Sequence, residues 1–431
     1  MSPRSPAFIM LCTVSLIASA GNMALQAVLP AIGRQFQLAD TLVVGVFAIS
    51  ALMWTVASPV WARLSDRLGR KRVILIGMAG FSASMAGFGL AATSGLEQWL
   101  GPVMAFVLMG VARTIYGVFG SAAPIASQAY VADRTAPAER TQAMSLLASA
   151  QGLGTVIGPT LAPLLILPVV GLAGPMYAFS LVAAIAFVWV LKKLPSGGVT
   201  RVPSSTGQPD HDGRGLWKDS RVRDFLLYGL LVTGAQAINI SVLGFHVIDE
   251  MAETGLTTVQ AQPFIAVAMF AGAAGTLMVQ WGLIPLLRLQ PRALMRWGAG
   301  LALAGNVLSI LTPGFYGVVV GYAVVSMGVG FARPGFTAGA SLAVGPGEQG
   351  AVAGLMMSIA GISFLFPPVI GVALYQLAAF APFAANAVLM ISALLVCWWS
   401  ASLQSAGVSV NIGVEATSEP PASQPGPEGN R

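Results

Sequence analysis

Two arginines stand out in this 431-residue chain because each lies within a long apolar run. Arg113 ends the sequence Gly110-Val111-Ala112-Arg113, and Arg333 ends the similar sequence Gly330-Phe331-Ala332-Arg333. An arginine inside a membrane is costly unless it is paired or faces water, so such residues mark functional sites. Unpaired positive charge in surroundings of low dielectric attracts anions. The two side chains therefore predict an interior site for a carboxylate or another anionic group.

A structural role is the alternative for both arginines. Arg113 can satisfy backbone carbonyls of neighbouring helices. Arg333 precedes Pro334-Gly335, a pair that is expected to break the helix and to free carbonyl groups for the guanidinium. The sequence leaves anion binding and a structural role open.

Proton transfer needs groups that titrate, and the apolar runs hold few of them. No acidic residue falls in the middle of a predicted helix, and Asn22 and Gln26 in the first run do not titrate. His246, Asp249 and Glu250 lie together at the end of another run. A histidine–carboxylate cluster can titrate in a useful range, so these three are predicted proton-coupling residues. The alternative is an ordinary solvated helix end.

The sequence does not favour an enzyme. It has no Ser–His–Asp set, no metal-ligand spacing and no phosphate-binding glycine loop, so no catalytic residue, metal or cofactor is expected. The net charge of +6 does not indicate nucleic acid, because the charges occupy short loops between apolar runs. The two cysteines, Cys12 and Cys397, lie in apolar runs and are expected to be packing residues.

Transmembrane helices are the elements that would position these residues. The chain is 56% hydrophobic and only 9% charged, whereas soluble proteins are about 25% charged. Its solvent must therefore be lipid, in which a spanning helix needs about 20 apolar residues. The segments that qualify number twelve and are 7–29, 41–62, 73–93, 101–125, 143–167, 174–191, 225–247, 262–286, 293–312, 315–341, 351–375 and 379–402.

Two polar stretches organise the chain. Residues 192–224 separate six predicted helices from six, so the bundles are expected at 1–191 and 225–404. Residues 405–431 form a tail rich in Pro, Ser, Gly and Glu. Both polar stretches are expected to be disordered.

The two halves also resemble each other beyond the arginine sequences. Pro137-Ala138-Glu139 matches Pro346-Gly347-Glu348, and Pro159 matches Pro368 at the same offset. Repeated six-helix halves around a midplane cavity are typical of secondary transporters. Chance similarity between helices rich in Gly and Ala is the alternative.

Lys and Arg indicate the orientation. They gather in the linker and in the loops after the second, fourth and eighth predicted helices, while the opposite side has only Arg34. The positive-inside rule then places both termini and the linker in the cytoplasm. The first apolar run is interpreted as an uncleaved spanning helix that ends at Pro30.

The loop after the second predicted helix carries a family resemblance. Its residues 62–71 read Ala-Arg-Leu-Ser-Asp-Arg-Leu-Gly-Arg-Lys, which resembles the loop signature G-x-L-a-D-r-x-G-r-k of the major facilitator superfamily, with Ala62 in place of the first glycine. Gly69 permits a tight turn, and a carboxylate can pair with a nearby arginine. The resemblance implies a cytoplasmic latch that governs conformational switching. Its predicted residues are Asp66, Arg67, Gly69, Arg70 and Lys71.

The fifth predicted helix resembles the signature g-x-x-x-G-P-x-x-G-G of the drug–proton antiporter branch. Gly154, Gly158 and Pro159 match, whereas Ala162-Pro163 replaces the closing glycine pair. Small residues four apart let helices approach closely, and ordinary packing of that kind is the alternative. The resemblance implies export coupled to proton flow.

The fourth predicted helix adds a third similarity. Arg113-Thr114-Ile115-Tyr116-Gly117 resembles the signature R-x-x-q-G, with Tyr116 in place of the glutamine. In this family the corresponding arginine is linked to proton transfer, which makes Arg113 a further proton-coupling residue by resemblance.

Polar and aromatic residues are expected to line a cavity between the halves, although helix packing or lipid contact explains each one equally well. The expected lining consists of Asn22, Gln26, Trp54, Arg113, Tyr116, Gln151, Gln236, Asn239, Arg333 and Phe364.

These features predict an all-α membrane protein of twelve transmembrane helices in two pseudo-symmetric six-helix bundles. The resemblance implies proton-coupled export of a small amphiphilic molecule by alternating access, as in multidrug or tetracycline-type exporters. The alternatives are a dedicated exporter of an anionic metabolite or carboxylate-type siderophore, and a non-transporting membrane receptor. The expected partners are the substrate, protons and lipid, and the expected form is a monomer in a bacterial inner membrane.

Overall fold

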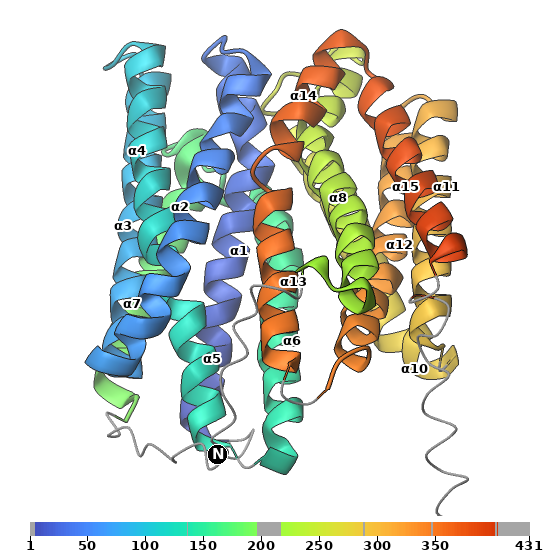
Figure 1. Cartoon of the computed structure of the whole chain (residues 1–431). Helices are drawn as coiled ribbons and strands as arrows, with labels where there is room; N and C mark the ends of the chain where they lie inside the picture. Colours follow the sequence, from blue (N-terminus) through green and yellow to red (C-terminus); the bar gives the residue numbers. More distant parts are fainter. Residues whose placement is uncertain are drawn as a thin grey trace, which may run out of the picture.

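The computed structural model describes residues 5–135, 137–195, 217–287, 289–345, 348–400 and 403, and these form helices joined by short turns (Figure 1). The expected disordered linker and tail fall mostly outside the described residues, as does the Pro346-Gly347 part of the second repeat sequence. The helices of the first half are α1 (Pro6–Gln35), α2 (Asp40–Leu68), α3 (Arg70–Leu96), α4 (Pro102–Gly120), α5 (Ala122–Arg134), α6 (Pro137–Leu161) and α7 (Gly174–Lys193). Those of the second half are α8 (Ser220–Glu253), α9 (Gln262–Leu277), α10 (Ile284–Leu287), α11 (Pro291–Leu311), α12 (Phe315–Leu342), α13 (Gln349–Ser363), α14 (Pro367–Leu377) and α15 (Ala381–Trp399).

Several of these helices join into longer segments. Helices α4 and α5 form one segment, Pro102–Arg134, and α9 continues through a π-helical turn at Met278–Leu283 into α10. Among the described residues, eleven segments are long and apolar enough to cross a membrane. Helix α6 is not among these eleven segments because it starts with charged residues, but its part from Ala143 onward is mostly apolar. If α6 is included, the described residues contain twelve such segments, the number that the sequence predicts.

The structure corrects one expected helix end, at Pro30, and one expected helix break, at Pro334-Gly335. Helix α1 continues through Pro30 to Gln35, and α12 continues through Pro334 and Gly335 to Leu342. A proline removes one backbone hydrogen bond, and transmembrane helices tolerate that loss where neighbouring helices pack on them. The ring of Pro30 packs on Gly244 of α8. Because α12 does not end near Arg333, capping of a broken helix does not explain this arginine.

A second expected helix end is also wrong. The sequence predicts that the fifth helix runs to residue 167, but α6 stops at Leu161, and a short 3-10 turn, Pro163–Leu165, follows. The second proline of the motif, Pro163, has no N–H for a helical hydrogen bond. Pro163 therefore ends α6, whereas Pro30 and Pro334 lie inside helices that continue past them.

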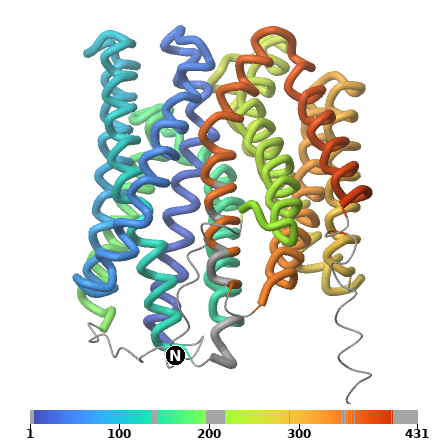
Figure 2. Tube along the Cα trace, viewed as in Figure 1, coloured from blue at the N-terminus to red at the C-terminus, as the bar shows by residue number. Residues whose placement is uncertain are grey.

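The two halves of the chain form two helical bundles. Figure 1 shows α2, α3, α4 and α7 on one side, α11, α12 and α15 on the other, and α1, α6, α8 and α13 between them. We call the end that carries the N-terminus and residues 62–71 the latch end. The opposite end, which carries the turns α1–α2 and α14–α15, is the far end (Figure 2).

Among the described residues, the halves share a hydrophobic core toward the far end. One buried cluster combines Ala20–Ile32 of α1 and Val43–Val46 of α2 with residues 238–251 of α8 and Val372 of α14. Toward the latch end the buried residues that the structure describes separate into three clusters. One of them contains residues of the first half only, and the other two contain residues of α8 and later helices only. The halves therefore share a hydrophobic core at the far end and have separate cores at the latch end.

Candidate functional site

Arg113 is buried in the first half of the chain, with 1% of its surface exposed. Its Nη2 donates hydrogen bonds to Oδ1 of Asn22 at 3.0 Å and to Oγ of Ser50 at 3.1 Å. These partners come from α1 and α2, so the guanidinium ties three helices together. Neither partner is charged, and the positive charge is therefore not neutralised by an ion pair with them.

Aromatic rings surround the rest of the guanidinium. Its Cζ lies 4.3 Å from the ring centroid of Tyr116 and 5.0 Å from that of Phe47. Trp54 packs against Tyr116 with ring centroids 5.6 Å apart. Aromatic faces attract a cation electrostatically, and more strongly when water is excluded. The guanidinium of Arg113 is thus surrounded by aromatic ring faces and by uncharged oxygen acceptors.

Two donors of Arg113 are left over. Nε and Nη1 are buried and have no hydrogen-bond partner among the described residues. Buried polar groups without partners are costly, and each calls for an explanation such as a bound ion or ligand. A carboxylate or phosphate can accept two parallel hydrogen bonds from one guanidinium. The arrangement can therefore bind an anionic group.

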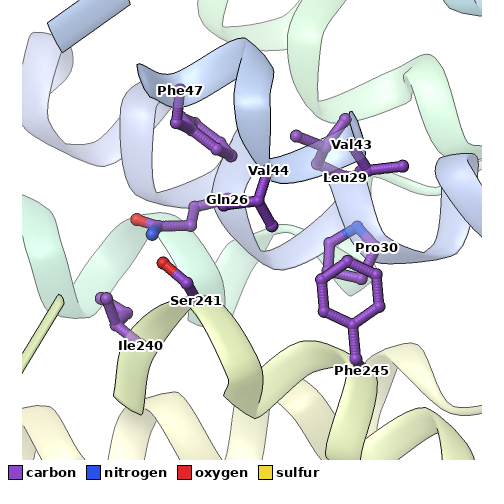
Figure 3. A pocket seen from close by; sticks show the side chains of 9 residues that line it. All are labelled: Gln26, Leu29, Pro30, Val43, Val44, Phe47, Ile240, Ser241 and Phe245. Carbon is purple, nitrogen blue, oxygen red and sulfur yellow. The ribbon is translucent and has the colours of Figure 1, made fainter. Parts of the chain in front are cut away.

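Gln26 lies one turn beyond Asn22 on α1 and faces Ser241 of α8, from the other half (Figure 3). Both line a small cavity with Phe47, which also contacts Arg113. The cavity holds about 10 Å³, enough for about one water molecule and far below the volume of about 300 Å³ that small-molecule sites need. This cavity by itself is therefore too small for a drug-sized molecule.

Arg333 is exposed although it lies well inside α12. Gly330, three residues before it, packs on Thr276 of α9, and Phe336, three residues after it, packs on Tyr228 of α8. At 100° per residue, Arg333 projects between these two directions. Helices α8 and α9 both contribute to the shared core, so this side of α12 faces the other half.

The structure brings together only part of the expected lining. Asn22, Arg113, Tyr116 and Trp54 form one cluster, with Gln26 next to it. Of the other residues, Asn239 is buried with an unpartnered Nδ2, Gln151 is exposed, and Gln236 and Phe364 are half-buried. For these four and Arg333, contact with a substrate stays a prediction.

The three expected proton-coupling residues of α8 lie at the far end. Asp249 accepts hydrogen bonds from Arg34 at 3.1 Å and from the hydroxyl of Tyr375 at 2.7 Å. His246 is buried, with its Nδ1 3.4 Å from the same hydroxyl, whereas Glu250 is half-buried. The cluster is thus an organised network rather than a set of separately solvated charges.

The latch residues surround Arg70. It forms ion pairs with Asp66 at 2.6 Å and with Asp133 of α5 at 2.9 Å. Gly69 has φ +90°, a conformation that side chains rarely adopt, so α3 can begin directly after α2. The latch arginine therefore joins α2, α3 and α5 within the first half.

Replacing Arg70 with Ala is expected to slow transport about fivefold. The change removes both ion pairs, each worth about 0.5 kcal/mol at a half-exposed site, and leaves Asp66 and Asp133 to repel each other. Initial transport rates in vesicles measure the effect. Arg72→Ala is the matched control, because Arg72 is an exposed neighbour on the same helix. Equal rates for Arg70→Ala and Arg72→Ala would contradict the latch.

The second half has a different charge cluster at the latch end. Arg221 pairs with Asp219 at 2.7 Å and with Glu348 at 3.4 Å. Side-chain hydrogen bonds from Arg221 lower the pKa of the Asp219 carboxyl, and its backbone N–H adds to the effect. Glu348 belongs to the loop that the sequence matches with Pro137-Ala138-Glu139. Here too, these ion pairs remain within one half.

The glycines of the antiporter motif pack on α1. A Cβ added at Gly154 would lie 2.8 Å from Cβ of Ser19, and one added at Gly158 would overlap the backbone oxygen of Ala20. The motif therefore sets the distance between α6 and α1, two turns or less from Asn22.

Several residues of the site are not apparent from the sequence. Ser50, Phe47 and Ser241 look like ordinary helix residues, and only the fold brings them to Arg113 and Gln26. The sequence could have indicated a role for Arg34, because it is the only Lys or Arg predicted on the far side of the membrane, where acidic loop residues also lie. Tyr375 carried no comparable signal.

Comparison with known proteins agrees with this architecture. The family model of the Major Facilitator Superfamily matches residues 11–368. Multidrug resistance protein 2 of Bacillus subtilis is 26% identical over 387 residues, which cover 87% of this chain and 90% of that protein. The class C tetracycline resistance protein of Escherichia coli is 32% identical over 168 residues, which cover 38% of this chain and 39% of that protein.

Solved structures show the same fold. The nucleoside transporter NupG superposes with a TM-score of 0.69 at 13% identity, covering 93% of this chain and 99% of that one. The human organic anion transporter MFSD10 superposes with a TM-score of 0.62 at 19% identity, covering 92% of this chain and all of that one. With the family model matched over most of its length, this multi-pass membrane protein is a transporter of the Major Facilitator Superfamily.

Proposed function

We propose that this transporter exports a small amphiphilic molecule in exchange for protons. The observation that carries the proposal is the packing of Gly154 and Gly158 of α6 against the backbone of α1. Helix α1 supplies Asn22 to the guanidinium of Arg113. The antiporter motif is thereby connected, through one helix, to the interior charge. Relatives named as multidrug and tetracycline resistance proteins support export of an amphiphile.

An anionic cargo is the second proposal, and the leftover donors of Arg113 favour it. Nε and Nη1 of this buried guanidinium can bind one carboxylate. Arg333 offers a second cation on the equivalent helix of the other half. A dedicated exporter of a carboxylate-type siderophore or anionic metabolite would use both charges.

The proposal also covers the orientation of the protein in the membrane and its oligomeric state. The basic residues of the latch end support an orientation in which that end faces the cytoplasm of a bacterial inner membrane, with both termini on that side. The chain then opens to the cytoplasm in this conformation, because the halves are joined at the far end. A monomer suffices, since each half-chain supplies one bundle around the path.

Transport into proteoliposomes with an imposed pH gradient tests these proposals. Matched cationic, neutral and carboxylate-bearing amphiphiles are compared with and without the gradient. Proton-driven export predicts accumulation that depends on the gradient, and anionic cargo predicts preference for the carboxylate. Movement that ignores the gradient would exclude antiport. Binding without movement of any compound would instead favour a receptor.

A further inference from the structure

Asn22 is the part of the Arg113 cluster that reaches accessible surface. Arg113 and Ser50 are buried, whereas Asn22 is half-buried. Gln26, four residues further along α1, faces Ser241 of the other half (Figure 3). Residues four apart lie on the same face of a helix, so Asn22 also faces the other half, one turn nearer the latch end. A molecule that enters between the halves therefore meets Asn22 before it meets Arg113.

The orientation of the Asn22 amide is fixed by its partner. A guanidinium has hydrogen-bond donors and no acceptor, so Oδ1 of Asn22 must face Nη2 of Arg113, and the two atoms are 3.0 Å apart. The Nδ2 group therefore points away from the guanidinium, and it carries two N–H donors. It donates no hydrogen bond to the part of the chain that the structure describes. Both donors are available to an acceptor on a bound molecule.

The helices around Arg113 bring no carboxylate to it. Helices α1, α3 and α4 hold no acidic residue, and α2 holds only Asp40 and Asp66. At 1.5 Å per residue, these two lie about 15 Å and about 24 Å from Ser50 along the helix. Each of them already forms an ion pair with another arginine. A neutral residue at position 22 therefore leaves the charge of Arg113 uncompensated, which is costly for a buried cation.

We propose that Asn22 determines which head group the transporter accepts, and that the accepted group is a carboxylate. Nδ2 of Asn22 donates to a carboxylate oxygen while Oδ1 stays on Arg113. The hydrogen bond from the guanidinium polarises the amide and strengthens its N–H donors. The bound anion supplies the negative charge that the protein lacks at this place. The inference rests on the proposed export of an anionic cargo and assigns the selection of that cargo to one residue.

Asn22→Asp changes the charge and the donors at this position with almost no change in shape. The carboxylate of an aspartate is close in size to the amide of asparagine, but in its ionised form it only accepts hydrogen bonds. Beside the guanidinium it forms a charge-assisted pair with Arg113. The interior charge is then compensated by the protein itself. The variant should therefore reject a carboxylate and still accept a neutral amphiphile.

Equilibrium binding of three matched compounds measures the preference for a head group. Phenylbutanoate, the neutral phenylbutanamide and the cationic phenylbutylamine share one aromatic body and differ in the head group. Their dissociation constants are measured by isothermal titration calorimetry on the purified full chain in lipid nanodiscs, at equal pH and salt. The wild type is expected to bind phenylbutanoate about tenfold more tightly than phenylbutanamide, because hydrogen bonds to charged groups are the stronger ones.

Three variants separate the charge at position 22 from other effects. Asn22→Asp is expected to weaken the binding of phenylbutanoate at least about tenfold and to leave that of phenylbutanamide nearly unchanged. Asn22→Ala removes the amide but keeps the uncompensated charge, so its preference for phenylbutanoate over phenylbutanamide should persist. Gln35→Glu is the matched control, because it makes the same amide-to-carboxylate change at an exposed position of α1, about 20 Å away along the helix. It should bind all three compounds as the wild type does.

Two outcomes would overturn the assignment to Asn22 alone. One is an Asn22→Asp protein that keeps the wild-type ratio of the dissociation constants of phenylbutanoate and phenylbutanamide. The other is an Asn22→Ala protein that loses this ratio, because neutrality at position 22 would then not select the head group. Thermal unfolding shows whether each variant folds, and Asn22→Ala decides the question if Asn22→Asp does not fold.

Failure of the proposed function gives a different result. Equal binding of all three compounds by the wild type would contradict the anionic cargo, and the role of Asn22 with it. Proton coupling does not enter a binding measurement at constant pH. Transport in proteoliposomes that ignores the pH gradient would therefore exclude antiport and leave the selection by Asn22 standing.

Discussion

Arg113→Ala is expected to reduce transport about 100-fold. The guanidinium makes hydrogen bonds to Asn22 and Ser50 and lies against Tyr116 and Phe47. Charge-assisted hydrogen bonds are worth about 1.5–3 kcal/mol each, and about 3 kcal/mol corresponds to about 100-fold. The loss removes both the interior charge and the donors available to a cargo. Initial rates of substrate uptake into inverted vesicles measure the effect.

Arg113→Lys separates charge from geometry. A lysine keeps the charge but loses the planar fork that binds a carboxylate with two hydrogen bonds. It should therefore keep partial transport of neutral amphiphiles and lose the carboxylate-bearing ones. Thermal unfolding of the detergent-purified variants shows whether each one folds. Folded Arg113→Ala protein that transports every compound at the wild-type rate would refute the role of this residue.

Gly158→Val is the second change with a large expected effect. Its added carbons would overlap the backbone oxygen and carbonyl carbon of Ala20, which cannot move unless α1 and α6 separate. Overpacking of this kind costs about 1–3 kcal/mol, and rigid backbone allows little relief. We expect transport to fall at least about tenfold and the unfolding temperature to drop.

Gly152→Val is the matched control on the same helix. No atom lies within 4 Å of a Cβ added at Gly152, so the helix accepts the side chain without displacement of a neighbour. Purified protein of both variants is compared by thermal unfolding and by transport. Similar behaviour of the two variants would show that the close approach of α6 to α1 is dispensable.

The sequence predicts the helices of this protein well because lipid imposes a simple rule on length and polarity. The errors occur at prolines, where local sequence cannot tell a tolerated proline from a helix end. Pro30 is accommodated by Gly244 of another helix, 214 positions away in the chain, and no local pattern contains that information. Pro163, in contrast, follows the end of α6 and begins a short 3-10 turn.

The charged residues of the site could be predicted from the sequence, but the residues that contact them could not. Arg113 could be singled out because a charge in an apolar run is rare. Its partner Ser50 could not, since its hydroxyl also donates a hydrogen bond to the backbone oxygen of Phe47 in its own helix, as Ser58 does with Trp54. The far-end network shows the same limit, because Tyr375 reaches Asp249 only through the packing of α14 on α8.

Simultaneous measurement of substrate and proton movement tests the central claim most directly. Purified protein is placed in liposomes that contain a pH-sensitive dye, and a substrate gradient is applied without an initial pH difference. Substrate flow is expected to drive protons in the opposite direction, and Arg113→Ala is expected to reduce both flows together by about 100-fold. Substrate flow with no proton movement, or with protons moving in the same direction, would contradict proton-coupled export.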